Sequence, residues 1–290
     1  AEEYIQSARA HIANGKTSSA ILELKNAVLI DFNNPESRLL LGSLYMEKGD
    51  IEAAEKELTR SLELNGEIER ILPKLFKALN LQDKSEKIIA LAEQVEKLPD
   101  SILPELLLYK ALSYIKLGDN RKAKDVISHL TDIASDSVYS QIGEAYILAE
   151  SYKINQALSL IDVSLKRNPD LTEALLLKGQ LLFIQGDFET AITAFNDYHA
   201  LLPTNVKVRL FLANSYVRAQ RYSEAEKHLD FLLKLLPEHS FTNQLKGLTF
   251  YQKGDYENAL THTNKAIQNG LNIPANRIVA GLSAFKLEQY

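Results

Sequence analysis

The stretch from residue 172 to residue 201, TEALLLKGQLLFIQGDFETAITAFNDYHAL, decides the fold of this chain. Two small residues in it, Gly179 and Ala191, stand twelve positions apart among large apolar residues at helical spacing. Packed helices come close together only where the side chains at their crossing are small, so these two residues mark a predicted contact. Between them Gly186 interrupts the pattern, because glycine readily takes the left-handed conformation that ends a helix. The stretch therefore predicts two amphipathic helices joined by a tight turn.

The same pattern recurs along the whole chain. Repeats begin at Ala1, Pro35, Glu69, Pro104, Val138, Thr172, Val206, Ser240 and Pro274, and every interval is 34 residues except one of 35. The eighth position is small in eight of nine repeats, and the twentieth is Ala in seven of the eight complete ones. The third repeat departs from this, with Phe76 and Ile88 in the small columns and Asp83 in place of the turn glycine. We expect that repeat to be distorted or to bend the array.

Two further columns mark the ends of the helices. Glycine stands at the fifteenth position of five repeats, as Gly15, Gly49, Gly118, Gly186 and Gly254. Proline, which has no N–H to continue a helix, stands at the thirty-second position as Pro169, Pro203 and Pro237. Each repeat is therefore predicted to run helix, turn, helix, turn.

A 34-residue period with small eighth and twentieth positions, an aromatic residue or Leu at the eleventh and a late proline resembles the tetratricopeptide repeat. The resemblance covers residues 1–290 and implies an all-α, right-handed superhelical solenoid of about eight and a half repeats in one domain. The ninth repeat has a first helix from about Ala275 to Leu287 and lacks a second. A solenoid needs polar caps and neither end supplies one, so we expect a fragment of a longer array. Self-association through the uncapped ends is the alternative.

Three segments carry a narrower resemblance: Ala20–Asp31 (AILELKNAVLID), Glu36–Tyr45 (ESRLLLGSLY) and Ala54–Gly66 (AEKELTRSLELNG). They resemble the long tetratricopeptide lipoproteins of bacterial exosortase and PEP-CTERM exopolysaccharide systems. This implies a periplasmic or outer-membrane-tethered scaffold in a bacterium, with a signal peptide and a lipidated Cys upstream of Ala1. A chain without Cys is compatible with oxidising and reducing compartments alike, so a cytoplasmic location is the alternative.

Composition excludes several classes of function. Hydrophobic residues make up 46% and charged residues 24% of the chain, which is the composition of a folded protein. The net charge of −5 leaves no excess of Lys and Arg to neutralise a phosphate backbone, so nucleic acid is not an expected partner. No run reaches the 18 or so apolar residues of a membrane span.

No motif for catalysis, a cofactor or a metal stands out. The GKT tripeptide at 15–17 lacks the earlier glycine of a phosphate-binding loop, because Ala10 stands there. The histidines form no i, i+4 pair with a carboxylate partner, although His228 and His262 share the twenty-third position of neighbouring repeats. Those two are expected to lie near each other as a weak surface metal site at most. No G-x-S-x-G elbow occurs, so we expect a chain that is not an enzyme and holds no cofactor.

In the tetratricopeptide family the first helices line a concave groove. By that resemblance the partner-binding groove of this chain contains Leu108, Leu112, Ile142, Tyr146, Leu176, Phe183, Leu210, Asn214, Val217, Arg218, Leu248 and Tyr251. A groove that is apolar with aromatic edges suits an extended or helical peptide, with Arg218, Lys207 and Glu150 orienting it. The alternative is that these side chains pack against one another inside a tightly wound superhelix.

Two functions remain open at this point. The first is a non-catalytic scaffold that binds a peptide or protein partner, within a bacterial envelope exopolysaccharide or secretion system. The second is the regulatory or substrate-docking arm of an enzyme whose catalytic domain lies outside this chain. The solenoid fold hosts many unrelated partners and does not choose between them.

Overall fold

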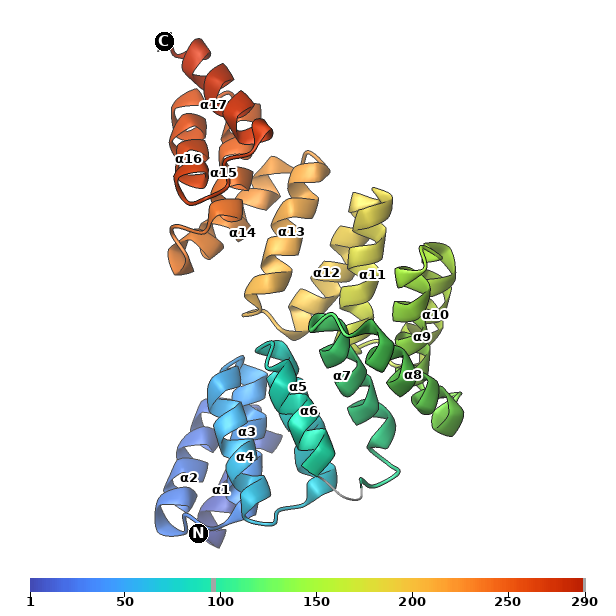
Figure 1. Cartoon of the computed structure of the whole chain (residues 1–290). Helices are drawn as coiled ribbons and strands as arrows, with labels where there is room; N and C mark the ends of the chain where they lie inside the picture. Colours follow the sequence, from blue (N-terminus) through green and yellow to red (C-terminus); the bar gives the residue numbers. More distant parts are fainter. Residues whose placement is uncertain (95–97, 289–290) are drawn as a thin grey trace. The chain divides into compact units, whose positions relative to one another are not determined.

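A computed structural model describes residues 1–94 and 98–288 of the chain, and within them the secondary structure is entirely helical (Figure 1). The helices are α1 Glu2–Ala13, α2 Thr17–Ile30, α3 Pro35–Lys48, α4 Ile51–Glu63, α5 Ile68–Leu81, α6 Ser85–Gln94, α7 Leu103–Lys116, α8 Asn120–Ala134, α9 Val138–Glu150, α10 Ile154–Arg167, α11 Thr172–Gln185, α12 Phe188–Leu201, α13 Val206–Arg218, α14 Tyr222–Leu235, α15 Ser240–Gln252, α16 Tyr256–Gln268 and α17 Pro274–Lys286. They fall into two compact units, Ala1–Arg167 and Asn168–Tyr290.

The odd-numbered helices are the first helices of the repeats. Each begins at the predicted repeat start or one residue before or after it. Within each unit a first helix packs against the second helix of its own repeat, and that second helix packs against the next first helix. Some successive first helices also touch, for example α5 with α7 and α13 with α15. The predicted all-α fold of paired repeat helices is confirmed. A single solenoid domain stays a prediction, since each unit is compact by itself.

The turn between the paired helices uses two adjacent residues. Gly49 ends α3 with a φ of 76°, and the carboxylate of Asp50 then accepts a hydrogen bond from the backbone N–H of Ala53 at 3.3 Å. Glycine has no Cβ to clash in this left-handed conformation, and the aspartate caps the first free N–H groups of α4. Asp119, Asp187 and Asp255 cap α8, α12 and α16 in the same way.

In the first unit, the small columns permit the predicted close approach. A Cβ added to Gly42 of α3 would lie 2.8 Å from Cγ of Leu58 in α4, so only glycine fits there. The third repeat fills the same places with the fully buried Phe76 and Ile88. Asp83 takes the left-handed turn conformation itself, with a φ of 54°.

In the second unit the crossing of α11 and α12 is tighter still. A Cβ on Gly179 would lie 2.4 Å from the ring of Phe195, which is fully buried. A Cβ on Gly281 of α17, at the equivalent position, would meet no atom within 4 Å. The neighbouring Ile278, Leu282 and Phe285 are exposed.

No helix in the described ranges is both long enough and apolar enough to cross a lipid bilayer.

Candidate partner-binding surface

The twelve predicted groove residues lie on first helices of both units. Four of them are core residues: Leu108 is 1% exposed, Leu112 5%, Ile142 0% and Val217 4%. Leu108 and Leu112 lie on α7, which packs against α8 and α9. Ile142 lies on α9, which packs against α7, α8 and α10, and Val217 lies on α13, which packs against α12, α14 and α15. We therefore assign these four to the core, where the self-packing alternative holds, and they are not available to a partner in this structure.

The other eight side chains reach solvent at least in part. In the first unit only Tyr146 remains. In the second unit Arg218 is exposed and the others are half-buried, namely Leu176, Phe183, Leu210, Asn214, Leu248 and Tyr251. We call these seven residues the first-helix surface of the second unit. They stay predicted contacts for a partner.

Tyr146 borders a small pocket within the first unit. The pocket has a volume of about 210 Å³ and is lined by Ile115, Asn120, Ala123, Tyr146, Ile147, Ala149 and Glu150. Its acidic edge is Glu150, whose carboxylate binds Nδ2 of Asn120 at 2.6 Å and Nζ of Lys124 at 3.0 Å. The pocket has an apolar floor, and Lys124 already neutralises the charge of Glu150. It therefore suits a small apolar side chain of a partner better than a cation.

Aromatic pairs edge the first-helix surface of the second unit. The Phe183 and Phe188 rings meet edge to face with centroids 5.2 Å apart, and Tyr251 and Tyr256 do the same at 5.7 Å. The guanidinium of Arg218 lies 5.1 Å from the centroid of Phe188, within the range of a cation–π interaction. These contacts hold the end of a first helix to the start of a second helix, and all four rings are half-buried.

Sequence reasoning missed the second member of each pair. Phe188, Tyr222 and Tyr256 all stand at the seventeenth position of their repeats, 34 residues apart, where the second helix begins. The aromatic residue that follows the Gly-Asp turn was the available signal. It lies outside the first-helix positions that the resemblance to the family indicates.

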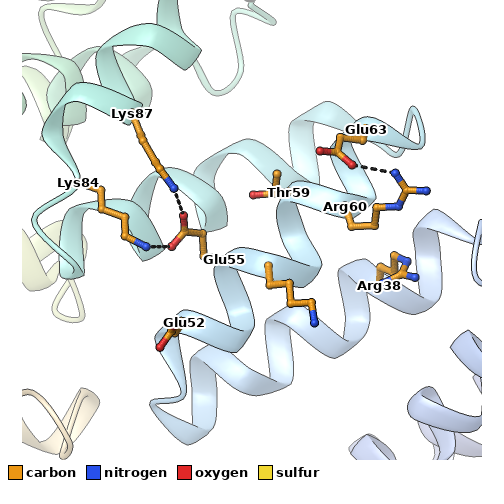
Figure 2. Close-up of a pocket in the computed structure, with 9 residues that line it drawn as sticks. Arg38, Glu52, Glu55, Thr59, Arg60, Glu63, Lys84 and Lys87 are labelled. Atoms are coloured by element: carbon orange, nitrogen blue, oxygen red, sulfur yellow. Dashed lines mark hydrogen bonds and ion pairs between the residues drawn. The ribbon is translucent and has the colours of Figure 1, made fainter.

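A charged pocket of about 580 Å³ lies between α4 and α6 in the first unit, outside the predicted groove (Figure 2). The carboxylate of Glu55 accepts hydrogen bonds from Lys84, from Nζ of Lys87 at 3.0 Å and from the side-chain amide Nε2 of Gln82 at 2.7 Å. Burial alone would raise the pKa of Glu55, but these hydrogen bonds outweigh it and hold the pKa below its ordinary value. At the rim, Arg60 pairs with Glu63 at 2.9 Å. The charges of this pocket are largely engaged with one another, which is typical of a structural clamp.

The histidines are arranged differently from the prediction. His228 packs against His199, with ring centroids 5.7 Å apart, whereas His262 stacks on Phe250 and bonds Asn243 at 2.9 Å. The shared sequence position thus does not bring His228 and His262 together as a pair. Within residues 1–94 and 98–288, no three His, Asp or Glu side chains gather in an arrangement that could hold a metal ion.

Comparison with known proteins agrees with this architecture. Two tetratricopeptide-repeat family models match residues 11–69 and 212–270, and the model described as anaphase-promoting complex, cyclosome, subunit 3 matches residues 150–232. No curated protein matches the chain.

Solved structures share the fold at low sequence identity. The Cut9-Hcn1 hetero-tetramer of the APC/C aligns over 97% of this chain and 55% of its own, with 13% identity and a TM-score of 0.60. MamA (41-end) from Desulfovibrio magneticus RS-1 aligns over 59% of this chain and 97% of its own, with 17% identity and a TM-score of 0.50. A MamA mutant aligns over 59% and 99%, with 20% identity and a TM-score of 0.50. This chain spans about half the length of the APC/C chain that it matches.

The chain is a tetratricopeptide-repeat protein. Proteins of this family bind protein partners and are generally non-catalytic, so the family is that of an interaction scaffold.

Proposed function

We propose that this chain is a non-catalytic scaffold that binds an extended or helical peptide of a partner protein on the first-helix surface of the second unit. The observation that carries the proposal is the row of aromatic pairs at the edge of that surface, Phe183 with Phe188 and Tyr251 with Tyr256. Aromatic side chains with exposed faces are enriched at protein interfaces, because they bury a large apolar area at little cost in side-chain entropy.

The surface offers two kinds of contact to a peptide. Leu176, Leu210 and Leu248 repeat at intervals of 34 and 38 residues along successive first helices and provide half-buried apolar contacts. Arg218 adds an exposed positive charge. Its contact with the ring of Phe188 restricts the motion of the guanidinium in the unbound chain. A preorganised arginine loses less conformational entropy when it binds a carboxylate or a backbone carbonyl. The preferred partner segment is therefore apolar with an acidic residue.

Photo-crosslinking tests this placement directly. A benzoylphenylalanine is introduced at Phe183, at Tyr251 or, as the control, at Leu235, which is 53% exposed at the end of second helix α14. After irradiation in the source cells, crosslinked partners are identified by mass spectrometry. We expect the same partner segment from Phe183 and Tyr251 and none from Leu235.

The crosslinked segment is then synthesised and its affinity measured by calorimetry. Phe183→Glu and Tyr251→Glu should each weaken binding at least tenfold, while Leu235→Glu should leave it unchanged, provided that all variants melt like the parent. If the same segment crosslinks as strongly from Leu235, or if its affinity is insensitive to both glutamates, the first-helix surface is not the binding site.

We further propose that the scaffold serves a bacterial envelope system for exopolysaccharide or secretion. The three segments that resemble the lipoproteins of exosortase and PEP-CTERM systems, at 20–31, 36–45 and 54–66, support this location. The test is the complete reading frame together with cell fractionation: a signal peptide with a lipidated Cys and recovery in the envelope agree with it. Recovery in the cytoplasm, or a catalytic domain in the same frame, would favour the docking arm of an enzyme.

A further inference from the structure

The second unit contains a cluster of imidazole, phenol and guanidinium groups that the first-helix surface does not use. His199 of α12 and His228 of α14 meet edge to face, with ring centroids 5.7 Å apart and planes at 73°. The ring of His228 also stacks on Tyr216 of α13, at 5.6 Å and 17°. Nδ2 of Asn196, one turn before His199, donates to the hydroxyl of Tyr216 at 3.2 Å. The cluster thus joins three consecutive helices.

A positive charge that acts on both rings, Arg209, has no counterion among the described residues. The guanidinium of Arg209 is stacked over Phe231 at 3.8 Å from the ring centroid, and its Nε donates to the carbonyl of Pro203 at 3.0 Å. In the described part of the chain, no carboxylate pairs with Arg209 and no acceptor binds its Nη groups. Burial lowers the pKa of Arg209, although the group keeps its proton at any ordinary pH.

One ring nitrogen of each imidazole, Nδ1, also has no hydrogen-bond partner among the described residues. Nδ1 of His199 and Nδ1 of His228 are buried, and no group among the described residues forms a hydrogen bond with either atom. Burial, followed by the charges of His199, Arg209 and Lys227, lowers the pKa of His228 to about 4, and burial with Arg209 lowers that of His199. Buried polar atoms are nearly always hydrogen-bonded, so a pair without partners beside an unpaired arginine indicates that an acceptor belongs there.

We propose that the cluster of His199, Arg209, Tyr216, His228 and Phe231, here called the imidazole cluster, binds an oxyanion, either a carboxylate or a phosphate group. Arg209 supplies two adjacent donors in the geometry that carboxylates and phosphates accept. The negative charge also offsets the repulsion between the guanidinium and a protonated imidazole, so one ring can gain a proton and become a further donor. Binding and protonation therefore strengthen each other, and for an anion of constant charge the affinity rises as the pH falls toward the pKa of the imidazole in the complex. None of these residues belongs to the first-helix surface, so this inference stands apart from the proposed function.

Histidine side-chain NMR on the whole chain is the test. The pKa values of His199, His228 and His129 are followed by ¹H–¹⁵N spectra without added anion, with inorganic phosphate and, separately, with acetate, at constant ionic strength. His129 is exposed on α8 and serves as the control. We expect a saturating anion to raise the pKa of His228 or His199 by about one unit and to leave His129 unchanged. A response to phosphate alone assigns a phosphate group, and a response to acetate assigns a carboxylate.

Variants separate the site from a general effect of salt. Arg209→Gln should abolish the anion-dependent shift, and Arg277→Gln, which removes an exposed arginine on α17, should retain it. Because Arg209→Gln also loses packing on Phe231, Asn196→Asp at the exposed edge is a second variant, and its added negative charge should weaken anion binding at least threefold. The proposal is overturned if neither anion moves the two imidazoles, or if His129 moves equally.

Discussion

Nζ of Lys87 lies 3.0 Å from Oε1 of Glu55, and Lys84 binds the other oxygen of the same carboxylate. Glu55 belongs to α4 and both lysines lie at the start of α6, so a single acidic side chain fastens two second helices of the first unit (Figure 2). The carboxylate is nearly buried, with its side chain 11% exposed, while the lysines reach solvent. The clamp therefore depends on Glu55 more than on either lysine.

Glu55→Gln should destabilise the first unit by ~1–2 kcal/mol, because it leaves two lysines facing a neutral amide in a partly desolvated pocket. The free energy of unfolding in urea is the measurement, and Glu52→Gln, an exposed position on the same helix, is the control with an expected change near zero. Since the pKa of Glu55 is lowered in the folded chain, its contribution is present above the ordinary pKa of 4.5 and is lost as the pH falls through the lowered value. Equal stability of Glu55→Gln and the parent at pH 7 would contradict the clamp.

Two glycines at equivalent repeat positions should respond in opposite directions to alanine. Gly179→Ala places a Cβ 2.4 Å from Phe195, whose ring is fully buried and stacked on Phe211 at 5.1 Å, so it should cost ~1–3 kcal/mol. Gly281→Ala meets no atom within 4 Å and lies inside α17, where the better helix propensity of alanine should add up to ~1 kcal/mol. Urea denaturation of both variants gives the comparison. A similar loss in both would show that the crossing at Gly179 can relax.

Ile142 lies in the core of the first unit, although the sequence predicted that it contacts a partner in the groove. Ile142 is fully buried, so Ile142→Ala should lower the free energy of unfolding by ~2–4 kcal/mol. Leu29→Ala removes a side chain that is 81% exposed in the same unit and should change stability by less than ~0.5 kcal/mol. Thermal and urea melts of the two variants give both values. A small effect of Ile142→Ala would contradict its place in the core and favour the predicted contact with a partner.

Acid should weaken the second unit through its half-buried histidines. His228 has a pKa of about 4 in the folded chain against an ordinary value of 6.5, so below pH 6.5 the unfolded chain binds a proton that the folded chain does not. The free energy of unfolding therefore falls as the pH falls, by ~1–2 kcal/mol from this residue between pH 7 and 4.5, allowing for its partial exposure. Burial also lowers the pKa values of His199 and His262, which adds to the same trend.

His228→Phe checks that assignment, because it keeps an aromatic ring against Tyr216 and cannot take up a proton. Its free energy of unfolding, measured by urea titration from pH 7 to pH 4.5, should depend less on pH than that of the parent. An unchanged pH dependence would place the acid sensitivity elsewhere. The measurement requires a buffer other than phosphate or acetate, since an oxyanion bound at the imidazole cluster would reduce the loss.

The sequence by itself determined the repeat. The 34-residue period, the small residues at Gly42 and Gly179 and the Gly-Asp turns each follow from local rules that recur in most of the repeats. Steric contact at a helix crossing and the left-handed turn need only the residues next to them in sequence or in the paired helix. That locality is why the starts of the first helices could be predicted to within one residue.

Only the tertiary structure decided which predicted groove residues reach solvent. Leu108, Ile142, Leu176 and Leu210 all occupy the fifth position of their repeats, yet the first two are buried and the last two are half-buried. Likewise His228 shares its repeat position with His262 but packs against His199. Exposure and side-chain pairing depend on the angle and distance at which neighbouring helices cross and on the size of the side chains between them. The 34-residue repeat in the sequence contains no information on either.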